Sequence, residues 1–309
     1  RVAGGLMTPI TGMRMVKSWR IDETWPVARD FYRGIESELG ASFFHQLAIA
    51  RIFRSQQEAG HWARRRDDAA FASYLEEDPL VVAGNGEPAA PFGGFAMRRC
   101  GWVDLGVFLE RSRAFFEAEG AFSVGEFDEE ALDPAAPEWE GVRVEGAVIH
   151  CAGHEARFSR FFDWVPFKPA KGEILTVELD PAPVLKRILN CGNWLLPLGG
   201  GRFRTGTTYC WDDLDPVPTQ RARQTIEAGL REIVGERGVR VTRHVAGVRP
   251  IIRESKVLFG RHPAHPRLGF FNGLGSKGVL NAPFFAERFA AHLVDGVAIE
   301  EEVDLRRNF

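Results

Sequence analysis

The run Gly273-Leu274-Gly275-Ser276-Lys277-Gly278 is the first candidate for chemistry, because it has the form GxGxxG. It follows a strand-like run and opens a predicted helix, as a dinucleotide-binding turn does. Glycines let the backbone approach a ligand closely, and free N–H groups at a helix start attract negative charge. Three interpretations stay open: a pyrophosphate site, a site for another anionic or electron-rich ligand, or a structural tight turn. Only about 30 residues follow the motif, too few to complete a βαβ unit, which argues against the pyrophosphate.

Arg249 is the second candidate, because Pro250 follows it and holds it in an extended conformation. An arginine that leaves a strand in this way can bind a carboxylate through two parallel hydrogen bonds. The alternative is a surface arginine in a salt bridge.

Other familiar reaction centres are absent from the sequence. Four cysteines form no CxxC pair, which excludes a zinc ribbon and a thioredoxin motif: Cys100, Cys151, Cys191 and Cys210. Free, mostly buried thiols are typical of the reducing cytosol, so we expect a cytoplasmic protein. The eight histidines form no HExxH motif, so we expect no metal site. Without GxSxG, an α/β-hydrolase nucleophile is unsupported.

Composition limits the possible partners. The 309 residues are 45% hydrophobic and 26% charged, which is ordinary for a globular chain long enough to form two domains. The net charge of −3 disfavours nucleic-acid binding. No apolar run approaches the length of a membrane span. The chain begins at Arg1 without a signal-peptide pattern, so we expect its natural N-terminus to lie upstream.

Hydrophobic periodicity predicts elements that could hold these candidates. A helix capped by Asp22 or Thr24, with Pro26 in its first turn, should end at Gly40. Asp104 should cap a second helix that ends before Gly120. Further helices are predicted near Tyr74 within residues 56–78, over 218–235 and over 277–294. The opening stretch, residues 1–13, reads as a buried loop.

The predicted strands are of two kinds. Residues 146–153, GAVIHCAG, read as a fully buried parallel strand that ends in a small-residue turn. Residues 172–210 alternate as antiparallel strands, with Gly199–Gly201 as a hairpin turn. Strands are also expected within 43–53, 256–260 and 268–272. The fold class is therefore α/β with mixed sheets.

Five segments together resemble the D-amino-acid oxidase, glycine oxidase and sarcosine oxidase superfamily of FAD-dependent amine oxidoreductases. They are VAGGLMTPITG, AVIHCAG, FKPAKGEILTV, NWLLPLGGGRFRTGTTY and GVRPIIRESKVLFGRHPAHPRLGFFNGLGSKGVLNAP. The resemblance covers nearly the whole chain, and these motifs are specific jointly rather than singly. It implies a Rossmann-like FAD-binding domain with parallel strands, over residues 1–50, 100–165 and 245–309. A substrate domain with an antiparallel sheet would comprise residues 51–99 and 166–244.

The resemblance also implies roles for individual residues. Arg249 falls on the family's carboxylate-binding arginine, and Trp194 and Tyr209 fall on positions in the wall of the substrate pocket. The last helix should point its start at the pyrimidine side of the flavin and stabilise negative charge there. The implied cofactor-binding residues are Gly5, Leu6, Ala152, Gly153, Gly273, Gly275, Ser276, Lys277 and Gly278.

The function implied is oxidation of a small amino acid or secondary amine, with hydride transfer to FAD. An imine would form, and the electrons would pass to oxygen, giving hydrogen peroxide, or to another acceptor. One alternative is a flavin dehydrogenase of the same fold that acts on a hydroxy acid or another non-amine. The other is a non-catalytic remnant that binds a carboxylate or a partner chain.

Two departures from the family pattern stand out. The family's own FAD-pyrophosphate GxGxxG precedes the Ala-Gly-Gly loop in a βα unit, and this chain begins just after that point. Trp194 stands where many relatives have a tyrosine, so an indole N–H replaces a hydroxyl as the donor.

Overall fold

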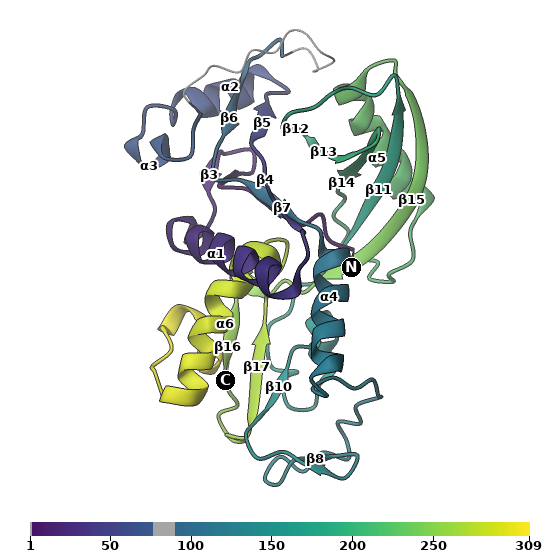
Figure 1. Ribbon diagram of the computed structural model, residues 1–309. Coiled ribbons are helices and arrows are strands. Elements are labelled where there is room, and N and C mark those ends of the chain that lie inside the picture. The colour runs from purple at the N-terminus through teal and green to yellow at the C-terminus, as the bar shows by residue number, and fades with distance from the viewer. Residues whose placement is uncertain (1, 77–89) are drawn as a thin grey trace.

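The computed structural model describes residues 2–76 and 90–309. Its largest element is a seven-stranded sheet with the order β15-β11-β14-β13-β12-β5-β6 (Figure 1). All neighbouring pairs in it are antiparallel except β12 and β5, which are parallel. The strands are β5 (Ile49–Ile52), β6 (Gly94–Met97), β11 (Ala170–Asp180), β12 (Ile188–Cys191), β13 (Asn193–Gly199), β14 (Arg202–Gly206) and β15 (Gly238–Arg249).

Helix α5 (Gln220–Val234) covers one face of this sheet. Its apolar stripe, which includes Ile226 and Leu230, packs on Leu175 and Leu195 of the strands. The opposite face belongs to a second core that includes Ile174 and the first residues of the chain. The polar helix and the antiparallel strands predicted within 172–210 are confirmed.

A smaller three-stranded sheet has the order β10-β17-β16, with β10 (Val148–His150), β16 (Leu258–Arg261) and β17 (Leu268–Asn272). Strands β10 and β17 are parallel, with Val148 opposite Leu268, whereas β16 and β17 are antiparallel. Helix α6 (Gly278–Asp295) packs its phenylalanines against β16. Both sheets combine parallel and antiparallel pairs, which confirms the expected α/β class with mixed sheets.

The predicted burial of β10 is only partly correct. His150 is buried, but Val148 and Ile149 are half-exposed. Among the described residues β10 pairs only with β17, so it is an edge strand and one side of it has no neighbour. The sequence pattern indicates apolar surroundings but does not say whether a further strand covers them.

Two helices test the capping predictions. Asp104 caps α4 (Leu105–Ala118) as expected, and its Oδ1 accepts from the amides of Gly106 and Val107. Helix α1 (Ile21–Leu39) ends at Gly40 as predicted, with Gly40 in the left-handed region. Its predicted start is wrong, because the helix begins at Ile21 after a left-handed Arg20.

The two predicted cap residues have other partners. Asp22 accepts from Lys17 Nζ at 2.6 Å, and Thr24 Oγ1 donates to the carbonyl of Arg20. Pro26 therefore lies inside the helix rather than in its first turn. These tertiary and local bonds remove both side chains from a capping role.

The other elements are short. A small sheet has the order β1-β7-β4, and two hairpins pair β2 with β3 and β8 with β9. Their bounds are β1 (Leu6–Met7), β2 (Ile10–Thr11), β3 (Val16–Lys17), β4 (Phe44–Gln46), β7 (Gly101–Val103), β8 (Glu138–Trp139) and β9 (Val142–Arg143). The short helices are α2 (Gln56–Ala63) and α3 (Ala69–Ala72), and 3-10 turns span Gly153–Phe158, Arg253–Ser255, Glu301–Val303 and Leu305–Asn308. The end of the predicted segment 56–78 lies outside the described residues.

No helix in the described ranges has the length and apolarity that a membrane crossing requires. Within residues 2–76 and 90–309, no three histidine, cysteine or acidic side chains gather as metal ligands. The cysteines are less buried than expected. Cys100 and Cys191 are buried, but Cys151 is exposed and Cys210 is half-exposed.

Candidate functional site

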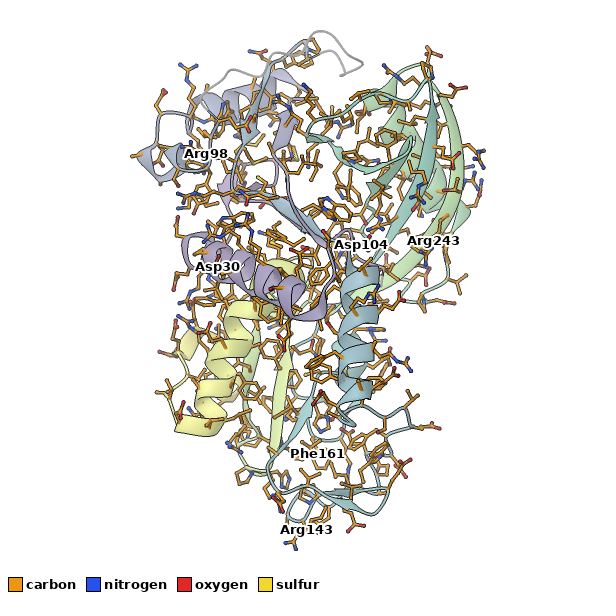
Figure 2. The ribbon with its side chains drawn as sticks, in the orientation of Figure 1. Asp30, Arg98, Asp104, Arg143, Phe161 and Arg243 are labelled. Carbon is orange, nitrogen blue, oxygen red and sulfur yellow. The ribbon has the colours of Figure 1, made fainter. Side chains whose placement is uncertain are left out.

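Arg249 ends β15, on the sheet face opposite α5. Figure 2 labels Arg243, which lies on the same strand. The half-buried guanidinium of Arg249 donates through Nη1 to the carbonyl of Lys171 at 3.3 Å. Through Nη2 it donates to Thr207 Oγ1 at 2.8 Å and to the carbonyl of Thr208 at 3.1 Å. The Nε–H and one N–H of Nη1 remain unused by these bonds.

The charge of Arg249 has no acidic partner among the described residues. Its contacts are neutral oxygens and the ring of Tyr209, whose centroid lies 4.0 Å from Cζ. Burial lowers the pKa of the guanidinium, because no neighbouring carboxylate among the described residues compensates its charge. Arginine nevertheless stays protonated, so the site is a held cation that lacks an anion.

Tyr209 forms one wall beside this cation. Its side chain is 46% exposed and stacks on Trp211 with ring centroids 5.8 Å apart. The ring of Tyr209 thus contacts both the guanidinium and the indole.

Trp194 occupies a different setting from Tyr209. It lies on β13, is 9% exposed, and a Cβ atom added to Gly4 would come 2.9 Å from its ring. The segment 2–5 crosses the same sheet face, since a Cβ on Gly247 would meet Val2 at 3.0 Å. Figure 1 shows the N-terminus at this junction, beside the lower end of β15. The structure thus places Trp194 beneath the opening loop.

Gly5 and Leu6 continue that loop. The carbonyl of Gly5 accepts from the amide of Val103 at 3.0 Å, and Leu6 pairs with Trp102. Gly5 has φ +74°, and a Cβ there would overlap the carbonyl oxygen of Val103. Only glycine fits this position, so the path of the loop between β7 and the large sheet depends on it. The predicted buried loop over residues 1–13 is only partly correct. The segment is buried at Gly5, Met7 and Ile10, but it includes β1 and β2, and Gly12 and Met13 are exposed.

The predicted flavin residues at the end of β10 and of β17 come together. Parallel pairing brings both carboxyl ends to one edge, where Asn272 Nδ2 donates to the carbonyl of Gly153 at 2.7 Å. Asn272 Oδ1 in turn accepts from the amide of Gly273 at 2.9 Å. Ala152 is exposed just before this contact. The edge of an open parallel sheet is where such folds bind ligands.

The start of α6 is open. No side chain caps it, and the amides of Gly278 and Val279 donate to no protein group among the described residues. Gly273 and Gly275 have φ of +81° and +52°, which only glycine adopts readily. Ser276 is exposed in this turn. The geometry leaves backbone donors and the positive end of a helix dipole available to an anionic or electron-rich ligand.

Lys277 precedes these free amides. Its Nζ contacts Ser18 Oγ at 3.0 Å and Thr11 Oγ1 at 3.4 Å, and no described carboxylate compensates it. Burial lowers the pKa of the ammonium. The side chain therefore ties the start of α6 to the segment 8–18 and adds positive charge where the helix dipole is already positive.

The two halves of the site are close in space. A Cβ on Gly275 would lie 3.6 Å from Ile251, whose amide donates to the carbonyl of Arg249 at 2.9 Å. A Cβ on Gly273 would come 2.9 Å from Ile252. The glycine turn and the arginine are thus joined through residues 251–252, although they belong to different sheets.

The profile of the family described as FAD dependent oxidoreductase matches residues 13–292. This chain belongs to that family. The match covers both sheets, Arg249 and the glycine turn, so the family assignment includes every part of the candidate site except its opening loop.

Individual curated proteins match only part of this chain. The glycine oxidase of Bacillus subtilis (strain 168) is 30% identical over 118 residues, which is 38% of this chain and 32% of that protein. The glycine oxidase of Pseudomonas putida is 27% identical over 126 residues, 40% of this chain and 34% of that protein. The matched segment thus spans about a third of the length of these curated relatives.

Similarity to solved structures covers far more of the chain. The crystal structure of glycine oxidase from Geobacillus kaustophilus has a TM-score of 0.78 at 17% identity, over 96% of this chain and 84% of that one. Iminodiacetate oxidase from Chelativorans sp. BNC1 has a TM-score of 0.74 at 18% identity, over 97% and 86%. At these identities the likeness establishes the fold.

Sequence reasoning missed the surroundings of the Arg249 guanidinium: Gly172, which leaves room for it, and Lys171, Thr207 and Thr208, which accept its hydrogen bonds. The signal for Gly172 is in the sequence, because a glycine inside an alternating strand marks a close approach of another group. For the two threonines there is no such signal. They reach Arg249 only because β11 lies between β14 and β15.

Proposed function

We propose that this chain forms the substrate-binding and ring-facing part of an FAD-dependent oxidase of a small amino acid or secondary amine. The observation that carries the proposal is Arg249, a half-buried cation held by neutral oxygens with no acidic partner among the described residues. A substrate carboxylate supplies the missing negative charge. The unused Nε–H and Nη1–H are the donors for it.

A carboxylate ligand is favoured energetically because the guanidinium of Arg249 is half-buried and its charge lacks an acidic partner among the described residues. A hydrogen bond to a charged group contributes about 1.5–3 kcal/mol, more than a neutral one. Thr207, Thr208 and Lys171 already fix the guanidinium, so little side-chain freedom is lost when the ligand binds. Tyr209 shields one side of the contact from water. Arg249, Tyr209 and Trp194 remain our predicted substrate residues.

The start of α6 fits the pyrimidine side of a flavin ring. Its uncapped amides at Gly278 and Val279 and the uncompensated ammonium of Lys277 all favour an electron-rich group. Gly275 leaves room there, since a Cβ atom would meet nothing closer than 3.6 Å. When bound, FAD supplies the hydride acceptor that turns the amine into an imine and passes the electrons to oxygen, as hydrogen peroxide, or to another acceptor.

The uncapped amides at Gly278 and Val279 and the closeness of the turn 273–278 to residues 251–252, which adjoin Arg249, favour the ring of the flavin over its pyrophosphate as the ligand of this turn. We therefore propose the ring-facing role for Gly273, Gly275, Ser276, Lys277 and Gly278. Gly5, Leu6, Ala152 and Gly153 are proposed to border the cofactor from the loop and from β10. The four unpaired cysteines support a cytoplasmic location.

Peroxide formation tests the proposal directly. The protein purified with added FAD is expected to be yellow and to form hydrogen peroxide with glycine, sarcosine or D-alanine. Peroxide or dye reduction with 2-hydroxy acids alone would identify the flavin dehydrogenase of the same fold instead. A preparation that stays colourless with excess FAD would refute the enzyme and leave a carboxylate- or partner-binding remnant.

A further inference from the structure

Residues 171–173 of β11 contribute to both faces of the large sheet. Arg249 lies over Gly172 on one face. Lys171 and Glu173 point to the other face, where they are 1% and 3% exposed. Buried charges of this kind are costly, and apolar residues in their place often give equal or greater stability. Their contacts therefore need an explanation other than stability.

Lys171 holds the middle of the segment 207–219, which joins β14 to α5. Its Nζ donates to Asp213 Oδ2 at 2.8 Å. Its backbone exchanges two hydrogen bonds with Cys210, at 2.8 and 3.0 Å. Both contacts fix the segment directly after Tyr209.

Glu173 holds the far end of the same segment. Its two carboxylate oxygens accept from the amide and from the hydroxyl of Thr219, each at 2.8 Å. Its backbone amide donates to Thr208 Oγ1 at 3.1 Å. His244 Nε2 lies 2.8 Å from the carboxylate without hydrogen-bond alignment, and Lys171 Nζ lies 4.0 Å away.

The near end of the segment carries the groups that hold Arg249. Thr207 and Thr208 accept its hydrogen bonds, and Tyr209 lies against it. The triplet 171–173 thus supports the arginine on one face and anchors the surrounding segment on the other. We propose that Lys171 and Glu173 are positioning residues that set the geometry of the Arg249 carboxylate site. This inference rests on the proposed function in that the ligand is a carboxylate.

Asp213→Asn is the mildest test, because Asp213 is exposed and the change removes the charged anchor of Lys171. The other bond of Asp213, in which Oδ1 accepts from the amide of Asp215 at 3.0 Å, can be kept by the carbonyl oxygen of Asn. Asp215→Asn is the matched control. Asp215 lies in the same segment and accepts from Val217, but it has no contact with β11 among the described residues. Glu173→Gln tests the second anchor, and Asp213→Glu should restore the first.

Acetate serves as the carboxylate probe, and its dissociation constant is measured by calorimetry on the FAD-loaded protein. Asp213→Asn and Glu173→Gln are expected to weaken acetate binding about fivefold or more, whereas Asp215→Asn leaves it unchanged. With an amine substrate, KM should rise by a similar factor while kcat stays within about twofold, as for a loss of ground-state binding. Equal acetate affinity in Asp213→Asn, Asp215→Asn and the parent would overturn the inference.

Hydrogen exchange at Cys210 and Thr219 separates positioning from mere stability. The two anchor variants should exchange faster over 207–219, with unchanged exchange in β13. Faster exchange with unchanged acetate binding overturns the positioning role, and unchanged exchange overturns the anchoring itself. Weakened acetate binding in a protein that oxidises no amine would sustain this inference while the proposed function fails.

Discussion

The guanidinium of Arg249 occupies the space that a side chain at Gly172 would need. A Cβ atom built on Gly172 would overlap Nη1, Nη2 and Cζ of the guanidinium. The two residues lie on adjacent strands, where Gly172 pairs with Gly247 and Ala170 with Arg249. The arginine therefore lies flat across β11, and its terminal groups reach the carbonyls and the hydroxyl of β11 and the 207–219 segment.

Gly172→Ala should displace Arg249 without unfolding the protein. We expect KM for the amine substrate to rise about tenfold or more, because the charge-assisted contact to the carboxylate is lost. Gly34→Ala is the control, since Gly34 lies in α1 with nothing within 4 Å of an added Cβ. That change should stabilise the protein by about 0.5–1 kcal/mol and leave KM alone. A KM that is the same in both variants would contradict the close packing.

Arg249→Lys keeps the charge but removes the planar fork. An ammonium cannot reach the three oxygens that hold Arg249 and also present two donors to a ligand. We expect a KM increase of about tenfold or more, again from loss of a charge-assisted contact, measured by steady-state kinetics. Arg253→Lys, at an exposed position four residues on, is the control. If both variants bind substrate equally well, Arg249 is not the carboxylate ligand.

Gly275→Val should lower flavin content. Valine is strained at φ +52°, and its branched side chain would fill the open space at the start of α6. The flavin released per protein by denaturation measures the effect. Gly296→Val is matched, because Gly296 also has positive φ (+70°) and an added Cβ there meets nothing within 4 Å. Loss of flavin in both variants would mean that backbone strain alone is responsible.

Stability should fall in acid because of His262. Burial lowers the pKa of this histidine, whose Nδ1 accepts from the amides of Ala264 and His265, each at 3.1 Å. Protonation removes that acceptor. Because the folded pKa lies below the unfolded value near 6.5, the contribution is complete above pH 6.5 and is lost as pH falls from there through the folded pKa.

His262→Asn checks this dependence, since the Asn carbonyl can accept from the same amides without titrating. The slope of unfolding free energy against pH should decrease by up to about 1.4 kcal/mol per pH unit below pH 6.5. Urea unfolding between pH 5 and 8 measures it. An unchanged slope would show that the titration of His262 is not linked to folding.

Several elements could be predicted because their causes are local. Asp104 caps α4 through bonds to amides two and three residues away, so the sequence alone specifies them. Gly40 ends α1 for the same kind of reason, a left-handed conformation that glycine tolerates. The prediction of where α1 begins was wrong because Asp22 bonds instead to Lys17 and to Tyr74, which lies far along the chain.

The residues of the candidate site also fall into those that the sequence indicates and those that only the tertiary structure shows. Residue types and their order were enough to indicate Arg249, the glycine turn at 273–278 and the family to which they belong. Only the tertiary structure decided that Trp194 lies under the opening loop, that Gly172 supports the arginine, and that Thr207 and Thr208 hold it. A cap or a turn is fixed by bonds within a few residues, whereas these contacts depend on which strands become neighbours, and that order is set by packing of the whole sheet.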